Sequence, residues 1–191
     1  EPVRFVPPRC AYSPEQLPFL NDRFRGPFID ERAQGCDYWW FEYGGTMDTI
    51  SKDGDITNEL HKIVWGIWDY VKNSGKFDAD NLTLEWIGSL PGKRESRRIV
   101  GDYILNQNDI QRQHRFDDAI GHGGWPLDIH PPEGIYSDQP PCHQISVGIY
   151  DIPLRILYSR DISNLFIAGR NASASRVAFS STRVQGTCAV M

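Results

Sequence analysis

A helical repeat of apolar residues between Asp55 and Gly75 is the strongest folding signal in this sequence of 191 residues. Apolar side chains recur there at spacings of three and four, which places them on one face of a helix. They are Leu60, Ile63, Val64, Ile67, Trp68 and Val71. Asp55 or Thr57 can cap the start, and Asn73-Ser74-Gly75 is a typical end. We therefore expect one amphipathic helix over this stretch.

The other expected elements are short. An aromatic run at 38–43 is bounded by glycines and predicts a strand that is buried on at least one face. Apolar patterning predicts further strands at 82–87, 145–150 and 156–158, and a short apolar strand at 165–168 that runs into Gly169. Asn108 can cap a short helix over 108–113, whereas residues 121–141 have the glycines and prolines of a loop.

The two ends of the sequence differ in character. The first forty residues are rich in Pro, Arg and aromatics, which predicts a long, extended and irregular arm. Residues 177–191 resemble the first turns of a helix and carry no stop signal. We therefore expect a fragment of a larger protein, with missing partners on both sides.

Composition excludes several classes of protein. Hydrophobic residues make up 40% and charged residues 24%, as in ordinary soluble globular proteins. Apolar stretches are only a few residues long, so we expect no membrane-spanning segment. The net charge is -5 and apolar runs separate the arginines, so a nucleic-acid partner is not expected. No Cys-x-x-Cys pair exists among Cys10, Cys36, Cys142 and Cys188, so no metal site is expected.

Positive charge is concentrated near the end of the sequence. Residues 152–191 contain five Arg and one Asp, whereas residues 1–95 contain 11 Lys or Arg and 16 Asp or Glu. Arginine outnumbers lysine by 15 to 5 over the whole chain. This preference favours planar, bidentate contacts with carboxylates or phosphates.

Three segments contain residues suited to chemistry. The first, residues 91–103, places Arg94, Arg97 and Arg98 around Glu95 and Ser96. Such a group can orient an anionic ligand, or it can lock two segments of the protein together by charge-assisted hydrogen bonds. The sequence leaves both interpretations open.

The second segment, residues 121–130, combines glycines with titratable side chains. Its glycines allow close approach of the backbone to a flat ligand. Its side chains His122, Asp128 and His130 can transfer protons. The alternative is a tight loop in which each histidine is simply hydrogen-bonded.

The third constellation joins residues 164–171 to residues 181–187. An apolar strand leads through Gly169 into small polar residues, and then into a helix start. Proteins use this arrangement to hold a phosphate or a carbonyl-bearing ring. However, the sequence has no Gly-x-Gly-x-x-Gly, and so no dinucleotide-binding fingerprint of its own.

Taken in order, these segments resemble a bacterial family of FAD-dependent oxidoreductases, some of which are labelled xanthan lyase. The motifs that carry the resemblance are GCDYWWFEYGG at 35–45, GKRESRR at 92–98, GGWPLDIH at 123–130, LFIAGR at 165–170 and STRVQGTC at 181–188. The resemblance covers nearly the full length. It implies a flavoprotein fragment that lacks the N-terminal dinucleotide-binding motif.

The resemblance implies an α+β chain in two parts. Residues 1–150 would form a substrate domain, an antiparallel sheet with helices. Residues 151–191 would form a returning strand and helix start of the FAD-binding α/β domain. The rest of that domain would be a partner, and we expect the fragment alone not to hold FAD tightly.

The resemblance also assigns roles to residues. The cofactor-binding residues would be Gly169, Arg170, Asn171, Ser173, Arg183, Val184 and Gln185. Arg170 stands where many flavoproteins have an acidic residue, so it could contact phosphate instead of ribityl. A helix opening at 183–186 would stabilise negative charge on the reduced flavin. Arg97 would orient a small-molecule or saccharide substrate, and His130 or His122 would act as acid and base.

A second class of function is a non-catalytic carbohydrate-binding or structural module. Five tryptophans would form its platform: Trp39, Trp40, Trp65, Trp68 and Trp125. The alternative is that Trp65 and Trp68 belong to a helix face and Trp39 and Trp40 to a sheet, so that they are mainly core.

Overall fold

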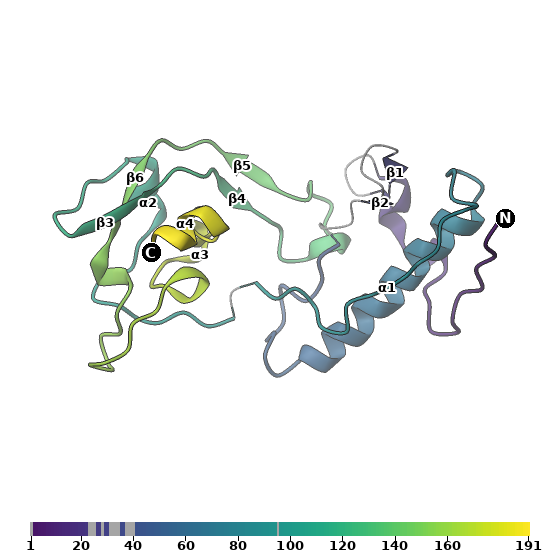
Figure 1. The fold of residues 1–191 in the computed structure, drawn as a ribbon, viewed down its shortest axis with the longest axis horizontal. Helices are drawn as coiled ribbons and strands as arrows, with labels where there is room; N and C mark the ends of the chain where they lie inside the picture. The colour runs from purple at the N-terminus through teal and green to yellow at the C-terminus, as the bar shows by residue number, and fades with distance from the viewer. Residues whose placement is uncertain (1, 23–25, 28, 31–34, 37–40, 95) are drawn as a thin grey trace. The chain divides into compact units, whose positions relative to one another are not determined.

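The computed structural model describes residues 2–22, 26–27, 29–30, 35–36, 41–94 and 96–191. Its helices and small antiparallel sheets confirm the predicted α+β class (Figure 1). The chain divides into two compact units. Unit 1 comprises Glu1–Gly92 and Pro131–Pro141, and unit 2 comprises Lys93–His130 and Cys142–Met191. The predicted division at residue 150 concerns membership of a substrate or cofactor domain, and it stays a prediction.

Unit 1 is built on the helix α1, Asp53–Asn73, which confirms the periodicity prediction. Its buried face carries Ile63, Ile67, Trp68 and Val71. The helix begins two residues before Asp55, and its N-cap Lys52 makes no side-chain cap. Asp53 and Asp55 instead lie in the first turn, where negative charge interacts favourably with the helix dipole.

The N-terminal region packs against this helix. Two 3-10 turns, η1 Pro14–Gln16 and η2 Pro18–Asn21, lie on either side of Leu17. Leu17, Phe19 and Leu20 are buried in the same core as the helix. The prediction of an extended arm is therefore wrong for these residues, because their apolar side chains pack against the apolar face of the helix.

The strand predicted at 82–87 does not form. Lys72 at the end of α1 donates instead to the carbonyl oxygens of Ala79, Asp80 and Leu82, at 2.6, 3.0 and 2.8 Å. The Leu82 carbonyl oxygen, the one acceptor of the three that lies in the predicted strand, is thus satisfied by a side chain.

The predicted aromatic strand at 38–43 lies partly outside the described residues, and its described part, 41–43, is not a strand. The short strands nearby are β1, Ile29–Asp30, and β2, Gly35–Cys36. They pair antiparallel.

Unit 2 contains two antiparallel strand pairs. β3, Ala119–Gly123, pairs with β6, Tyr150–Pro153, and β4, Leu127–Ile129, pairs with β5, His143–Ile145. Helices α3, Arg176–Thr182, and α4, Gln185–Val190, lie against these strands (Figure 1). The helix predicted from Asn108 is present as α2, Gln107–Gln111, capped by Asn106. The core of unit 2 centres on Tyr150, Ile152, Ile156 and Phe179.

Several boundaries in unit 2 differ from the predictions. Residues 121–130, predicted as loop, contain parts of β3 and β4. The strand predicted at 145–150 is replaced by the ends of β5 and β6, with residues 146–149 between them. The strands predicted at 156–158 and 165–168 reduce to one antiparallel bridge, between Tyr158 and Phe166. The 3-10 turns η3 Gly134–Tyr136, η4 Leu154–Ile156 and η5 Gly169–Asn171 complete the elements.

The helix predicted over 177–191 is broken in the middle. Arg183 ends α3, and Val184 has extended backbone angles of φ -69° and ψ 147° before α4 begins at Gln185. An extended residue interrupts the hydrogen-bond ladder of a helix. Within the described part of the chain, no helix has the length and apolar character needed to cross a membrane.

Candidate functional site

A buried charged cluster lies where strand β4 meets the end of α3. The carboxylate of Asp128 accepts from Arg183 Nη2 at 2.6 Å and from Gln144 Nε2 at 3.3 Å. The Nε2 atom of His130 lies 3.1 Å from Asp128 Oδ2 and 3.3 Å from Arg183 Nη2. Asp128 is 6% exposed and His130 is 5% exposed. We call Asp128, His130, Gln144 and Arg183 the Asp128 cluster.

The local sequence explains half of this cluster. Asp128 and His130 are two residues apart, so alternation along the strand places them on the same side. Arg183 comes from the C-terminal end of α3, and Arg176 at the start of the same helix donates to the His130 carbonyl oxygen at 3.4 Å. A buried carboxylate with an arginine at this distance forms a strong, charge-assisted hydrogen bond.

Acid should destabilise unit 2 through its buried carboxylates. Burial raises the pKa of Asp128, but bonds from His130, Gln144 and Arg183 outweigh it and the pKa is lowered. Burial also raises the pKa of Asp151, but hydrogen bonds from Phe116 N, Arg115 and His122 outweigh it, and the pKa is lowered. The unfolded chain therefore binds more protons than the folded one as the pH falls below about 4.

We therefore expect the melting temperature to fall as the pH drops below about 4. Circular dichroism melts over a pH series measure this. A melting temperature that rises or stays constant down to about pH 2.5 would contradict the lowered pKa values.

A second histidine, His122, is placed differently from His130. It lies on β3 opposite Asp151 on β6, with its Nδ1 atom 3.0 Å from Asp151 Oδ1. Asp151 is buried and also accepts from Arg115 Nη1 at 2.6 Å and from Phe116 N at 3.0 Å. The His122 ring itself is largely exposed. A buried carboxylate that orients an exposed imidazole suits proton exchange with a ligand.

Two hydroxyls connect strand β6 to helix α3. Ser181 Oγ donates to the carbonyl oxygen of Trp125 at 2.5 Å, and Tyr150 OH lies 2.7 Å from the same Ser181 Oγ. Since the Ser181 proton goes to Trp125, Tyr150 is the donor to Ser181. Burial raises the pKa of Tyr150, so this hydroxyl stays protonated. The pair fixes residue 125 of the predicted site against α3.

The turn that the resemblance assigns to the cofactor is compact. Gly169 has a φ of +76°, which favours glycine, and its Cα faces Cys188 on α4. Ser173 is 1% exposed, and its Oγ atom has no hydrogen-bond partner in the described part of the chain. Val184 is the N-cap of α4 and Gln185 its first residue. The helix start expected near 183–186 is therefore present.

The segment with several arginines, residues 93–99, runs beside this turn. Arg170 Nη1 donates to the Lys93 carbonyl oxygen, and Asn171 Nδ2 donates to the Arg97 carbonyl oxygen at 2.6 Å. The Ile99 N–H donates to the Asn171 carbonyl oxygen at 2.9 Å. The fold thus brings together two motifs that are more than 70 residues apart in sequence.

All the predicted site residues belong to unit 2, but they form separate groups. The contacts join His130 to Arg183, and Arg97 to Asn171. His122 instead pairs with Asp151. The sequence analysis missed Asp151, because an aspartate at a strand start carries no signal until its partner strand is known. No group of His, Cys, Asp and Glu among the described residues could hold a metal ion.

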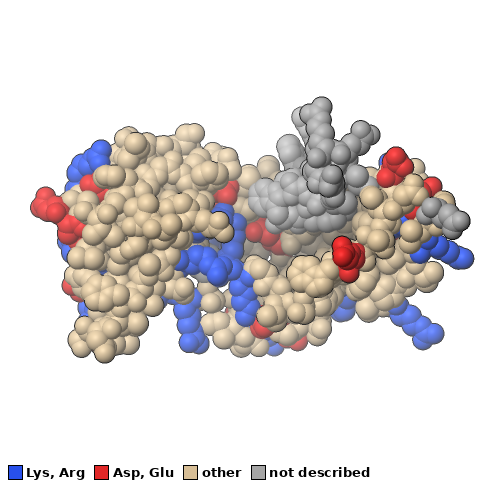
Figure 2. Space-filling view, viewed as in Figure 1, with Lys and Arg blue, Asp and Glu red and all other residues tan. Residues whose placement is uncertain are grey.

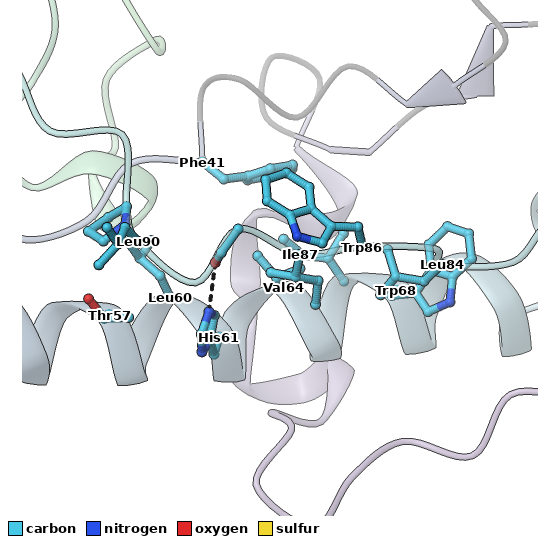
Figure 3. Close-up of a pocket in the computed structure, with 13 residues that line it drawn as sticks. Phe41, Thr57, Leu60, His61, Val64, Trp68, Leu84, Trp86, Ile87 and Leu90 are labelled. Carbon is cyan, nitrogen blue, oxygen red and sulfur yellow. Dashed lines mark hydrogen bonds between the residues drawn. The ribbon is translucent and has the colours of Figure 1, made fainter.

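Unit 1 contains a pocket of about 300 Å³ along α1 (Figure 3). Its lining is apolar and includes Phe41, Leu60, Val64, Trp68, Leu84 and Trp86. Its polar side chains are Thr57 and His61, and His61 Nε2 lies 3.0 Å from the Gly88 carbonyl oxygen. Trp86 is 78% exposed. The pocket can take an uncharged ring, because no charged side chain lines it.

The tryptophans that the sequence grouped as a platform lie in different places. Trp68 is buried, and Trp65 stacks on Phe5 with ring centroids 6.0 Å apart. Trp125 is exposed but belongs to unit 2. Trp39 and Trp40 lie outside the described residues. Trp65 and Trp68 therefore have the packing expected of a helix face.

Comparison with known proteins gives one match. A family model described as FAD dependent oxidoreductase matches residues 1–191, the whole chain. No curated protein matches, and no solved structure matches.

Proposed function

Because the chain belongs to the FAD-dependent oxidoreductase family, we propose that unit 2 forms part of an FAD site and of the adjoining substrate site of a flavoenzyme. The observation that carries this proposal is the Asp128 cluster, which joins the two predicted site regions, 121–130 and 181–187, through Arg183. The proposed reaction is the oxidation of a small molecule or saccharide.

The residues around η5 suit a cofactor with polar atoms. Ser173 buries a hydroxyl that no atom of the described residues satisfies, and such a group favours a ligand that can pair with it. Gly169 has a positive φ, which favours glycine, and the missing side chain leaves room for a ligand beside this turn. We propose that Gly169, Arg170, Asn171 and Ser173 hold FAD. FAD, when bound, supplies the acceptor for a hydride.

Residues at the start of α4 complete the proposed cofactor contacts. Arg183 is held by Asp128, so the backbone that leads into Val184 and Gln185 is fixed from one side. A fixed positive charge and N–H groups near a ligand favour negative charge on it. The sequence has no Gly-x-Gly-x-x-Gly, so the described residues do not include the fingerprint that holds a pyrophosphate in dinucleotide-binding folds.

The two histidines are suited to different tasks. His122 is exposed, and Asp151 contacts its Nδ1, which leaves Nε2 to exchange a proton with a substrate. His130 is buried in the Asp128 cluster and, through its Nε2 contact with Asp128, is suited to positioning the carboxylate that binds Arg183. Arg97 is exposed beside η5 and is suited to orienting a substrate. We propose His122 as the acid and base, and His130 as a positioning residue.

The test uses the complete gene product loaded with FAD. Alcohols, amines and sugars are screened without oxygen for bleaching of the oxidised flavin absorbance, and the rate is measured with the compound that bleaches it. We expect His122→Gln to slow flavin reduction by about 100-fold and to leave the FAD content unchanged.

The matched variant is His143→Gln, because His143 is an exposed histidine on β5 outside both groups. It should reduce flavin at the parent rate. Equal rates for His122→Gln and the parent would remove His122 from the mechanism, and a gene product that never binds FAD would refute the proposed function.

A second candidate function is ligand binding without flavin chemistry. The observation that favours it is the apolar pocket with the exposed Trp86 on its lining, since exposed tryptophan faces bind sugar rings and other apolar surfaces. Calorimetric titration with oligosaccharides in the absence of FAD tests it. Binding that Trp86→Ala abolishes would support a binding module.

A further inference from the structure

Hydrogen bonds hold residues 93–99 against the turn η5. Among the described residues, the hydrogen bonds between these segments use main-chain atoms of the first one: the carbonyl oxygens of Lys93 and Arg97 and the N–H of Ile99. The guanidinium groups of Arg97 and Arg98 make none of these bonds. Their positive charge is therefore not needed to lock the segments together.

The arginines of unit 2 differ in whether a carboxylate faces them. Arg115, Arg155 and Arg183 pair with Asp151, Asp118 and Asp128. Arg97, Arg98 and Arg170 have no carboxylate partner among the described residues. Among the described residues, no carboxylate therefore compensates these three guanidinium groups on two adjoining segments. In the space-filling view, Lys and Arg side chains lie at several separate places on the face shown (Figure 2).

Arg98 has the least satisfied of these guanidinium groups. Its carbon Cζ lies 5.9 Å from the centre of the Phe179 ring, which packs in the core of unit 2. Its Nη1 atom is buried and has no hydrogen-bond partner among the described residues. A charged donor that has lost water without gaining an acceptor is costly, and an anionic ligand on the same guanidinium would offset that cost.

We propose that Arg97, Arg98 and Arg170 form a binding site for an oxyanion group, either a carboxylate or a phosphate. Guanidinium groups bind both in the same bidentate way, so the shared chemistry is two neighbouring anionic oxygens. Phe179 holds the Arg98 guanidinium by its ring face, which orients the fork before the ligand arrives. The site itself rests on these contacts, whereas its assignment to the enzyme's own ligands rests on the proposed function.

The test is calorimetric titration of the 191-residue protein with sodium pyrophosphate and, separately, with sodium succinate, in low-salt buffer without phosphate. We expect at least one of the two anions to bind. Arg98→Gln and Arg97→Gln should each weaken that binding by about tenfold, because each removes a charge-assisted fork. Arg97 is exposed, so its variant should fold even if Arg98→Gln does not.

Arg112→Gln is the matched control. Arg112 is an exposed arginine of the same unit at the end of α2, away from residues 93–99 and η5 in the fold's contacts. It should bind each anion as tightly as the parent does. Equal weakening by Arg97→Gln and Arg112→Gln would show unspecific charge attraction and overturn the site, as would the absence of binding by both anions.

Competition with FAD in the complete gene product identifies the source of the anion. Displacement of pyrophosphate by FAD would assign the site to the cofactor's phosphates, and succinate binding that persists beside FAD would assign it to a substrate carboxylate. A gene product that binds pyrophosphate through Arg97 but never binds FAD would refute the proposed function while supporting the oxyanion site.

Discussion

Replacing Asp128 by asparagine is expected to lower the free energy of unfolding by about 3 kcal/mol. The substitution keeps the shape of the side chain but removes the charge that faces Arg183 at 2.6 Å. Asp128 is buried, so water cannot replace it as a partner for the arginine. Breaking one side of a buried ion pair costs more than the pair itself contributes, because the other charge stays desolvated. Denaturant unfolding measures the change.

Asp118→Asn is the control for this prediction. Asp118 also binds an arginine of unit 2, in a bidentate pair with Arg155 at 3.0 and 3.1 Å. The side chains of that pair are far more exposed, at 43% for Arg155 and 28% for Asp118. We expect a loss of about 1 kcal/mol or less there, because water compensates exposed charges. Equal losses for the two variants would contradict a special role for burial at Asp128.

The same variant separates stability from cofactor binding. If Arg183 contacts FAD as proposed, Asp128→Asn should weaken FAD binding in the complete gene product while Asp118→Asn leaves it unchanged. The two variants remove the same charge from the same unit, so a difference between them reflects position. Unchanged FAD affinity in Asp128→Asn would remove Arg183 from the proposed cofactor contacts.

Local periodicity explains which part of the fold was predictable. Most of the helix α1 was predictable because apolar spacing is a property of neighbouring residues, and Gly75, with a φ of +72°, follows its end as expected. Its start lies two residues before Asp55. The α2 helix was predicted from a capping residue, although the cap is Asn106 and not Asn108.

Long-range pairing explains most of the errors. Residues 82–87 have the alternation of a strand, but among the described residues no strand pairs with them, and Lys72 binds the Leu82 carbonyl oxygen. Residues 121–130 contain many glycines, yet residues 150–153 pair with them and make β3. Whether a short segment becomes a strand depends on a partner that is distant in the sequence.

The candidate site shows the same division between local and distant information. Alternation along β4 could have placed Asp128 beside His130, had the strand been expected. No local pattern connects either residue to Arg183, more than 50 positions later. The arginines at 97 and 98 were recognised, but their position beside η5 follows only from the bonds that Arg170 and Asn171 make.

A Gly134→Ala substitution is expected to detach residues 131–141 from unit 1. Gly134 has a φ of +59°, and an added Cβ would overlap the carbonyl oxygen of Glu42. The next residue, Ile135, is buried in the core beside α1 and donates its N–H to that same oxygen at 2.9 Å. Relieving the overlap requires Gly134 and Glu42 to move apart, which breaks the hydrogen bond from Ile135 to Glu42. Ile135 should then leave the core.

The expected cost combines two effects. A side chain at a left-handed position costs about 1–2 kcal/mol, and exposing Ile135 costs about 2 kcal/mol more. We therefore expect the free energy of unfolding to fall by roughly 3–4 kcal/mol. We also expect faster proteolytic cleavage within residues 131–141. Mass spectrometry of the cleavage products locates the site of cutting.

Gly75→Ala isolates the first of these effects. Gly75 has a φ of +72° in the same unit, but an added Cβ would meet no atom within 4 Å. It should cost only about 1 kcal/mol and leave residues 131–141 resistant to protease. Equal costs for the two variants would mean that backbone strain alone explains Gly134→Ala. A larger cost at Gly134, with cleavage confined to 131–141, would show that the contact with Glu42 holds this segment in unit 1.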